Sequence, residues 1–416
     1  MKVLYDTVLH GEYVRRPNRF VVVVNVDGTE MMAHLPNPGR MWELLFPGVR
    51  LYLVPHDKPG AKTKYRVVGI ERDGRPIMLD TNYSNDVAEH LIEQKLIPGW
   101  EEWSVVRREY TVGDSRFDLL LSNAEGKEFL LEVKSCTLFS KNGAMFPDAI
   151  TERGRKHLLH LKALQAEGYH TGVLFLVQWE AAQWFLPDYH TDIEFAKTFY
   201  EVAPDLDWKA VTLRWTADFT MPEVVGICQY DGQVIEREAH DAGDYAVVLH
   251  LDETTTVEVG SKGMMVFPAG YYVYVGSAKA NLEKRLERHK RKRKQMHWHL
   301  DYFRNVCDVI ATVPIRTADD LECDLAQAVK ETADWNMRGF GCSDCDCKSH
   351  LFGFDESRNP IHDKRFMDVI EDFRMNRLDP FIGHVGEIKV ITKPKKAVKQ
   401  QSSVSADGKP VKRRRK

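Results

Sequence analysis

The chain has 416 residues, of which 43% are apolar and 29% are charged, and its formal net charge is −3. This length exceeds that of one average domain, so about two to four domains are expected. No run of about eighteen or more apolar residues occurs, which excludes a transmembrane helix, and the N-terminal residues lack the apolar core of a signal peptide. Seven Cys, an odd number, argue against a secreted disulfide scaffold, so we expect a reduced, cytoplasmic location.

The small net charge conceals an uneven distribution. Ten Lys or Arg and one Asp lie between residues 393 and 416, which gives this tail +9 and leaves −12 for the rest of the chain. The tail has no apolar periodicity and is predicted to be disordered, as an arm for nucleic acid or as a solubilising tail. Because the rest is acidic, nucleic-acid binding has to depend on local basic patches.

Short apolar runs broken by Gly, Pro, Asn and Asp fill residues 1–80, which predicts a small antiparallel barrel or sandwich. Between two of these runs lies the loop HLPNPGRMWELLFPG, residues 34–48, with His34, Asn37 and Arg40 among Gly and Pro. The polar residues suit a phosphate-contacting surface. A structural loop fixed by Pro and Gly is an equal alternative.

The next part alternates helical and strand patterns, which is typical of an α/β layer. The helix at 151–167 has Thr151 as its N-cap. In chain order the expected elements are a helix at 85–95, strands at 103–112, 117–121 and 128–133, a helix at 151–167 and a strand at 171–177.

Two acids lie in or beside the apolar strands of the hairpin at 115–137. These are Asp118 and Glu132, and Lys134 follows two residues later. Burying a carboxylate inside the apolar run FLLEV costs free energy unless the carboxylate is paired or binds a metal. Two carboxylates and a carbonyl suit a hard cation such as Mg²⁺, and a lysine can hold or activate an attacking water. The alternative is that both acids simply face solvent.

The strings HLPNPGRMWELL, SRFDLLL, LEVKS, FPDA and TERGRKHL together resemble the sugar fermentation stimulation protein (SfsA) family over about residues 1–225. The element order also resembles the restriction-endonuclease-like PD-(D/E)xK fold. These resemblances imply an OB-like barrel, a nuclease-like domain and DNA binding largely without sequence preference. They further imply that Asp118, Glu132 and the carbonyl of Val133 bind Mg²⁺ or Mn²⁺, with Lys134 as base or transition-state stabiliser.

Further residues of the first half are candidates for contacts at this site. Glu89 on the preceding helix is placed to reach the metal through water. The residues of the helix at 151–167 are expected to meet the scissile phosphate, with a solvated helix face as the alternative. The DNA contacts predicted in this half are Arg40, Arg107, Arg153, Lys156 and His157.

A new domain is predicted to begin near residue 225. Nine Lys or Arg against two Glu between residues 279 and 294 would attract a phosphate backbone, although such a run can also be a solvated face. The DNA contacts predicted here are Arg288, Lys290 and Arg291. The expected elements are strands at 244–251, 254–259 and 270–277, a loop at 262–268, and helices at 281–294 and 363–374.

Two tyrosine-bearing strands followed by a basic helix resemble the GIY-YIG nuclease family. The strings YYVYVGSA, HWHLDYF and GFGCSDC resemble a domain of unknown function of the DUF123 type over about residues 240–355. The resemblance implies that Tyr245 or Tyr274 positions the attacking water, Arg285 stabilises the phosphate and Glu322 binds one divalent metal.

Three histidines, His289, His297 and His299, are candidates for proton transfer in this second site. The sequence also departs from the family pattern. The first motif is Gly-Asp-Tyr, with Asp244 in place of Ile, and the gap between the two tyrosines is longer than usual.

A cysteine-rich segment follows. Three thiolates and an imidazole so close together could complete a tetrahedral Zn²⁺ site. A redox-labile loop or buried cysteines are the alternatives. The predicted ligands are Cys342, Cys345, Cys347 and His350.

The sequence therefore predicts a multidomain α/β and β protein, most simply a cytoplasmic, metal-dependent DNA endonuclease with two nuclease-like domains. A DNA-binding transcriptional regulator of sugar metabolism that does not cleave, and an RNA-processing enzyme, are the alternatives. No membrane partner and no particular oligomeric state are expected. The predicted domains are a barrel at 1–80, a PD-(D/E)xK-like domain at 81–225, a GIY-YIG-like domain at 226–358, a helical extension at 359–391 and a basic tail at 392–416.

Overall fold

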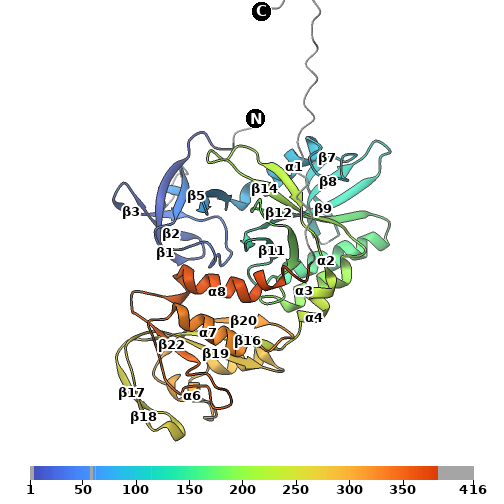
Figure 1. The fold of residues 1–416 in the computed structure, drawn as a ribbon. Helices are drawn as coiled ribbons and strands as arrows, with labels where there is room; N and C mark the ends of the chain where they lie inside the picture. The colour runs from blue at the N-terminus through green and yellow to red at the C-terminus, as the bar shows by residue number, and fades with distance from the viewer. Residues whose placement is uncertain (1–3, 57–59, 61, 114, 383–416) are drawn as a thin grey trace, which may run out of the picture.

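The structure is a computed structural model that describes residues 4–56, 60, 62–113 and 115–382. Three parts follow one another along the chain, and helix α8 lies between the third part and the first two (Figure 1). The tail predicted at 392–416 lies outside the described residues. Among the helices that are described, none is long and apolar enough to cross a membrane.

The first part is a closed, five-stranded, OB-like barrel, which confirms the prediction for this region. Its strands follow the order β3-β2-β1-β4-β5, and a parallel pairing of β3 with β5 closes the barrel. Val22, Val24, Leu51 and Leu53 fill its interior because alternate residues of a strand face the same side. The strands of this part are β1 (Leu9–Asn18), β2 (Val21–Val26), β3 (Thr29–His34), β4 (Arg50–Pro55), β5 (Tyr65–Arg72) and β6 (Arg75–Met78).

The second part is a six-stranded sheet of order β15-β14-β12-β9-β8-β7. The expected order of helix, three strands, helix and strand is confirmed, and Thr151 caps α2 by accepting a hydrogen bond from Gly154 N at 3.1 Å. The elements are α1 (Ser84–Glu93), β7 (Ser104–Val112), β8 (Ser115–Ser122), β9 (Glu128–Cys136), α2 (Glu152–Ala166), β12 (His170–Val177), α3 (Ile193–Val202), β14 (Asp207–Arg214) and β15 (Glu223–Ile227).

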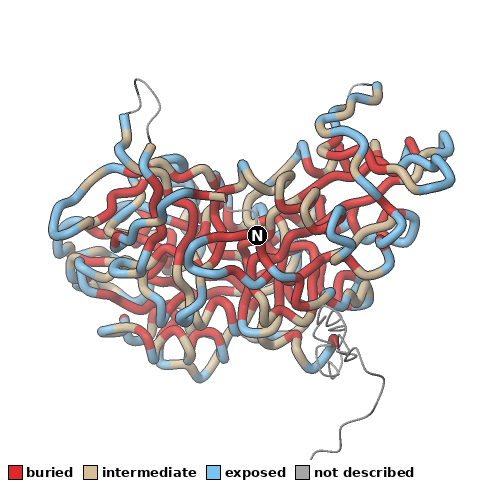
Figure 2. The backbone as a smooth tube through the Cα atoms, turned by 90° about the horizontal axis from the view of Figure 1, so that it is seen from above, coloured by how far each residue is buried: buried red, intermediate tan, exposed pale blue. Residues whose placement is uncertain are grey.

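Both faces of this sheet are covered. Val173 and Phe175 of β12 pack with α2 and α3, whereas Leu174 and Leu176 pack on the opposite face with α1. The strands of a sheet covered on both sides need apolar residues on both faces, which explains the continuous apolar sequence of β12. Figure 2 shows the resulting buried interior, with exposed segments at turns and loop tips. A small sheet of β10 (Leu138–Phe139), β11 (Gly143–Phe146) and β13 (Trp184–Pro187) and the helix α4 (Gly232–Glu238) complete this part.

The third part is a five-stranded sheet of order β20-β16-β19-β22-β21 with a separate hairpin of β17 and β18. Helices α5 and α6 share one apolar cluster with the sheet, and α7 and α8 share another. The elements are β16 (Gly243–Leu251), β17 (Thr255–Glu258), β18 (Met264–Phe267), β19 (Gly270–Ala278), α5 (Leu282–Lys290), α6 (His299–Phe303), β20 (Asp308–Arg316), α7 (Glu322–Thr332), β21 (Trp335–Asn336), β22 (Leu351–Phe354) and α8 (Lys364–Arg374).

Two expectations for the third part are wrong. The loop expected at 262–268 contains strand β18, because Met265 and Phe267 alternate towards the apolar cluster and pair with β17. The helix expected at 281–294 ends at Lys290, and Arg291 is extended. Of the four basic residues that follow the helix, Arg291, Lys292 and Arg293 are exposed, and Lys294 Nζ reaches the buried Asp301 at 2.8 Å.

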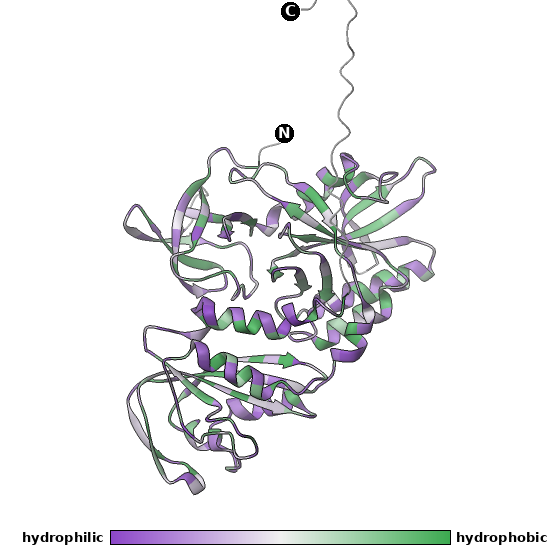
Figure 3. Ribbon diagram, viewed as in Figure 1, coloured by the Kyte–Doolittle hydropathy of each residue, from purple (hydrophilic) through white to green (hydrophobic). Residues whose placement is uncertain are grey.

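Helix α8 joins the three parts. Its buried face contains Phe366, Met367 and Ile370, and both apolar and polar residues lie along it in Figure 3. Near its end, Glu371 Oε2 lies 2.9 Å from Arg72 Nη2 of the barrel. Arg374 Nη2 lies 2.9 Å from Asp188 Oδ1 of the second part.

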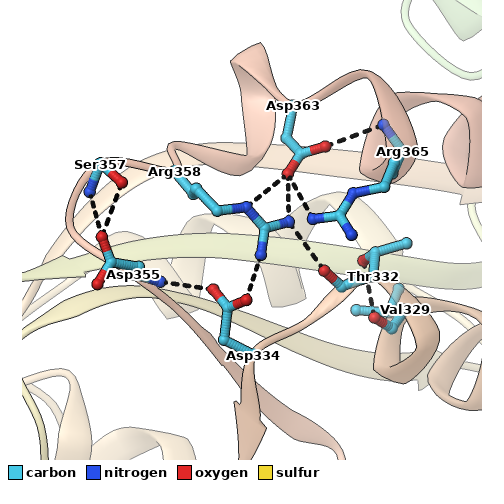
Figure 4. A network of polar contacts seen from close by, with 8 residues as sticks. All are labelled: Val329, Thr332, Asp334, Asp355, Ser357, Arg358, Asp363 and Arg365. Carbon is cyan, nitrogen blue, oxygen red and sulfur yellow. Dashed lines mark hydrogen bonds and ion pairs between the residues drawn. The ribbon is translucent and has the colours of Figure 1, made fainter.

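The beginning of α8 is fixed by the network in Figure 4. Arg358 donates from Nη2 to the Thr332 carbonyl at 3.0 Å and from Nε to Asp363 Oδ2 at 3.1 Å, and it also pairs with Asp334. Asp363 caps α8 by accepting from Arg365 N at 2.9 Å. One guanidinium therefore ties the end of α7 to the beginning of α8.

Candidate active sites and a candidate metal centre

The first site lies where β8 and β9 separate. Their last paired residues towards this end are Leu119 and Leu131, so Asp118 and Glu132 come next on adjacent strands. Instead of continuing the ladder, Val133 N donates to Asp118 Oδ2 at 2.8 Å. Asn85 Nδ2, at the start of α1, donates to Asp118 Oδ1 at 3.1 Å. These two bonds orient the Asp118 carboxylate at the edge of the sheet.

Glu132 is 3% exposed and one of its oxygens has two partners. Oε1 accepts from Lys134 Nζ at 2.5 Å and lies 2.6 Å from His157 Nδ1. Oε2 is buried and accepts no hydrogen bond from any described residue. An unpartnered buried carboxylate oxygen is costly, and a divalent cation shared with Asp118 would satisfy it. The donor set therefore fits a hard cation.

The two carboxyl groups differ in proton affinity. Burial, followed by the neighbouring charge of Glu132, raises the pKa of Asp118 above its ordinary value. Burial also acts to raise the pKa of Glu132, but hydrogen bonds from His157 and Lys134 bring it below its ordinary value. When the pH falls, Asp118 is therefore the first of the two to take up a proton.

The other predicted residues near this hairpin have different surroundings. His157 is buried against Glu132, and Arg153 Nε donates to His157 Nε2 at 3.4 Å. Lys156, next to His157 on α2, is exposed. Glu89 pairs with Arg108 rather than with the two acids. Arg107 is exposed, with its guanidinium 6.0 Å from the Tyr110 ring.

Arg40 holds the barrel against the second part. Its Nε donates to the Asp148 carbonyl at 2.5 Å and its Nη2 to Thr191 Oγ1 at 2.7 Å. The adjacent Gly39 packs so closely that a Cβ atom would lie 2.2 Å from Asp148 Oδ2. Arg16 donates to the carbonyls of this loop, including that of Gly39 at 2.7 Å. The loop is thus rigidly placed.

This barrel loop and the first site line one hollow of about 490 Å³, whose walls include Asn37, Pro38, Asp118 and Lys134. An adjoining hollow of about 560 Å³ extends to α5 of the third part. The residues that line both hollows are Arg19, Pro38, Gly39, Ala149 and Ile150. A groove therefore leads from the first site to the third part.

The second site lies between β16, β19 and α5. Tyr245 pairs with Gly276 across the strands, and its hydroxyl lies 2.9 Å from His289 Nε2. A Cβ atom at Gly276 would lie 2.6 Å from the Tyr245 hydroxyl, so this position requires glycine. The rings of Tyr245 and Tyr274 are 6.4 Å apart. The two predicted tyrosines and His289 are thus brought together.

Burial governs the protonation of this group. It raises the pKa of both Tyr245 and Tyr274. Burial, followed by the charge of Lys294, lowers the pKa of His289 to about 3. All three side chains are therefore neutral near pH 7, and the Tyr245 hydroxyl shares a hydrogen bond with His289 Nε2.

Glu322 lies on the other side of this site and both its oxygens are engaged. Oε1 lies 3.0 Å from His350 Nδ1, and Oε2 accepts from the Ser277 hydroxyl. Burial acts to raise its pKa, but the hydrogen bonds from His350 and Ser277 lower it below the ordinary value. Arg285 Nη1 donates to the Ser277 carbonyl at 2.7 Å. Ser277, which the sequence analysis missed, therefore links Arg285 to Glu322.

An aromatic ring, Trp298, lies close to two of the predicted arginines. The guanidinium of Arg285 lies 4.7 Å and that of Arg288 4.8 Å from the ring centre. The neighbouring His297 packs edge-on against this ring, and His299 Nδ1 accepts from Gly341 N at 3.0 Å.

The remaining basic residues predicted for DNA lie near the end of α5. Lys290 pairs with Glu287 at 2.5 Å, and Arg291 is exposed. Arg288 also pairs with Asp301 at 2.7 Å. Part of the positive charge of this helix is therefore balanced within the protein.

The cysteine group differs from the predicted set by one member. The ligand atoms of Cys323, Cys345, Cys347 and His350 all lie within 4.8 Å of one another, and Cys342 does not belong to the group. Cys323 comes from the first turn of α7, 19 residues before Cys342, where the cysteine-rich segment begins. Only the fold brings it there, so no local spacing could have revealed it.

Together, the OB-like barrel, the two-face α/β sheet with an acidic pair at its edge and a third α/β part define a multidomain protein. Comparison with family models identifies the family. The SfsA N-terminal OB domain matches residues 14–79, the sugar fermentation stimulation protein RE domain matches residues 82–218, and the domain of unknown function DUF123 matches residues 244–374. The chain belongs to the sugar fermentation stimulation protein family, with a DUF123 domain following the family's own two domains.

Individual relatives cover the first half of the chain. The sugar fermentation stimulation protein homolog of Methanothermobacter thermautotrophicus is 36% identical over 235 residues, which are 52% of this chain and 98% of that protein. The Clostridium tetani homolog is 38% identical over 195 residues, 47% of this chain and 85% of that protein. The solved structure of Pyrococcus furiosus SfsA in complex with Ca²⁺ is 29% identical, with a TM-score of 0.50, and covers 55% of this chain and 98% of that one.

Proposed function

We propose that this chain binds DNA and that its first site hydrolyses phosphodiester bonds with the help of a divalent cation, Mg²⁺ or Mn²⁺. The observation that carries the proposal is the buried Glu132 Oε2, which has no hydrogen-bond partner among the described residues while Asp118 lies on the adjacent strand. The Pyrococcus furiosus relative was solved in complex with Ca²⁺, which supports a divalent cation as the ligand of this chain. When bound, the cation would stabilise negative charge on the reacting phosphate.

The residues of the chain would share the remaining tasks. Asp118, Glu132 and the carbonyl of Val133 would hold the cation, and Asn85 keeps the Asp118 carboxylate in place. Lys134 Nζ, which borders the hollow, would orient the attacking water or take its proton. His157 contacts Glu132 Oε1, the oxygen that also accepts from Lys134, and helps to keep the Glu132 carboxylate charged.

The surroundings of the site favour a polymeric substrate. A hollow lined by the barrel loop leads into a second hollow that reaches α5, so a strand could extend beyond the reacting phosphate. Arg19 lines both hollows, and Lys156 is exposed beside His157. These cations would contact the phosphate backbone without reading the bases. OB-like barrels are a common platform for nucleic acids, and RNA remains a competing substrate.

The third part would supply a second hydrolytic site of the GIY-YIG type. Its support is the convergence of Tyr245, His289 and Arg285 on one side of the sheet. The neutral Tyr245–His289 pair would position the attacking water. Arg285 would stabilise the phosphate, and Glu322 would bind the divalent metal.

A second candidate function is DNA binding without cleavage, as in a transcriptional regulator of sugar metabolism. One observation favours it. Lys134 and His157 already contact Glu132 Oε1, so this oxygen has partners without a cation. Such a protein would use the same groove for binding alone.

A cleavage and binding panel separates these functions. Purified protein is incubated with plasmid, linear, single-stranded and branched DNA, and with RNA, in Mg²⁺ or Mn²⁺, and binding is measured on the same molecules. The endonuclease proposal predicts cleavage of at least one DNA that Asp118→Ala abolishes and the exposed-turn variant Glu125→Ala leaves intact. Binding to DNA without any cleavage would overturn the hydrolase and support the regulator, and exclusive cleavage of RNA would support RNA processing.

A further inference from the structure

The cysteine group of the third part has the dimensions of a tetrahedral metal site. Zinc lies about 2.3 Å from thiolate sulfur and about 2.0–2.1 Å from imidazole nitrogen, so a tetrahedral site separates sulfur and nitrogen by about 3.5 Å. Cys345 Sγ lies 3.5 Å from His350 Nε2. The atoms of Cys323 and Cys347 fall within the same 4.8 Å group. Four ligand atoms are therefore already gathered around one point.

The second observation concerns the tautomer of His350. His350 Nδ1 lies 3.0 Å from Glu322 Oε1. Because a charged carboxylate can only accept a hydrogen bond, Nδ1 carries the hydrogen and Nε2 keeps its lone pair. A histidine that binds metal through one nitrogen and donates to a carboxylate through the other is a recurrent arrangement in metalloproteins. His350 is 1% exposed, so its ring is held in this orientation.

We propose that Cys323, Cys345, Cys347 and His350 form a Zn²⁺ centre that fixes Glu322 in the second site. Three thiolates and one imidazole favour zinc over Mg²⁺ or Ca²⁺, which prefer oxygen. Four protein ligands leave no open position, so the centre is structural. Cys323 is exposed and the other two cysteines are half-buried, which leaves the centre accessible to the incoming ion.

The centre ties three segments together. Cys323 belongs to the first turn of α7. Cys345 and Cys347 lie in the loop before β22, and His350 is the residue directly before this strand. Bound zinc polarises the imidazole and strengthens its bond to Glu322. Glu322 in turn accepts from Ser277, whose carbonyl accepts from Arg285. This consequence, but not the zinc centre itself, rests on the proposed function of the second site.

Metal content tests the centre without any activity assay. The full chain, purified without chelator, is expected to contain about one zinc per molecule. Cys323→Ser and Cys345→Ser should lose it, whereas Cys342→Ser, the matched control outside the group, should keep it. Less than about a tenth of an equivalent in the wild type, or loss in Cys342→Ser with retention in Cys323→Ser, would overturn the proposal.

Cobalt provides a readout that needs no variant. Wild-type protein stripped by a chelator and titrated with Co²⁺ should develop thiolate-to-metal absorption and the visible bands of a tetrahedral site. Bands of octahedral Co²⁺ without thiolate absorption would contradict the centre, even if the serine variants failed to fold.

The link to Glu322 has its own test. Glu322→Gln should still bind one zinc, but competition with a chelator should show an affinity lowered by about tenfold to a hundredfold. Glu331→Gln, on an exposed position of the same helix, is the control and should match the wild type. Equal zinc affinities of the wild type, Glu322→Gln and Glu331→Gln would show that the zinc centre is not coupled to Glu322. Because none of these readouts involves cleavage, their failure is distinguishable from that of the proposed hydrolase.

Discussion

Arg374 Nη2 lies 2.9 Å from Asp188 Oδ1 and 3.0 Å from Asp188 Oδ2, and both side chains are buried. The same nitrogen donates to Thr191 Oγ1 at 2.9 Å. Because Thr191 also accepts from Arg40 of the barrel, one buried cluster joins all three parts. The groove that leads from the first site to α5 therefore has fixed walls.

Removing Arg374 should destabilise the protein strongly. Arg374→Ala leaves the Asp188 carboxylate buried without its cation, which costs about 3–5 kcal/mol. Urea unfolding followed by circular dichroism should show this loss in the free energy of unfolding. Arg365→Ala removes an exposed arginine of the same helix and should change stability by less than about 0.5 kcal/mol. Equal stabilities of the two variants would refute the role of the buried cluster.

Asp244 should make stability depend on pH. Burial, opposed by a hydrogen bond from Leu321 N, raises its pKa to about 7. A carboxyl group whose folded pKa is raised stabilises the protein below its unfolded pKa near 4, and this contribution is lost as the pH rises through 7. Asp244→Asn should therefore be more stable than the wild type at pH 8 and should show a flatter profile between pH 4 and 8.

The control for this prediction is Glu253→Gln, an exposed change in the same domain. Its unfolding midpoint should follow that of the wild type at every pH. If Asp244→Asn has the same pH profile as the wild type, Asp244 is ionised in the folded protein at neutral pH and the assignment fails.

Cation binding at the first site should weaken in acid. The pKa of Asp118 is raised by burial and by Glu132, so protons compete with the cation at a higher pH than for an ordinary aspartate. Calorimetric titration with Ca²⁺ should show affinity falling as the pH falls, and Asp118→Asn should abolish binding. Glu89→Gln should bind as the wild type does, since Glu89 pairs with Arg108. Binding that is independent of pH, or lost only in Glu89→Gln, would contradict the site.

The second site can be isolated in protein that carries Asp118→Ala. Any remaining metal-dependent cleavage should fall by about a hundredfold with Arg285→Ala, because Arg285 would stabilise the phosphate. Arg293→Ala, an exposed change in the basic segment after α5, should lower binding slightly and leave the rate of the bound complex unchanged. If Arg285→Ala leaves the cleavage rate unchanged, the residual activity does not come from the second site.

The hairpin of β8 and β9 could be predicted because its acids interrupt apolar runs and its flanking elements follow a regular order. The partners of those acids could not. Asn85 lies 33 residues before Asp118 along the chain, and only folding brings its amide to the carboxylate. The same holds for Cys323, whose place beside Cys345 depends on how α7 packs.

Local propensity predicts the wrong boundary where tertiary contacts decide. Lys and Arg are good helix formers, so the sequence predicts a helix that continues to Lys294. In the structure Lys294 instead pairs with the buried Asp301, and the helix ends at Lys290. At Gly263 the positive φ of 72° permits a tight turn, after which Met264–Phe267 form a strand where a loop was expected.

Hydrolysis at the first site is tested most directly by the rate of DNA cleavage in Mg²⁺ or Mn²⁺, compared between the Arg285→Ala parent and the same protein carrying Glu132→Gln. The amide keeps the size of the side chain but removes the charge that would hold the cation. We expect the parent to cleave, and we expect the Glu132→Gln protein to bind DNA equally well but to cleave at least about a hundredfold more slowly. Equal rates, or no cleavage of any DNA by the parent and the wild type, would contradict the proposed hydrolysis.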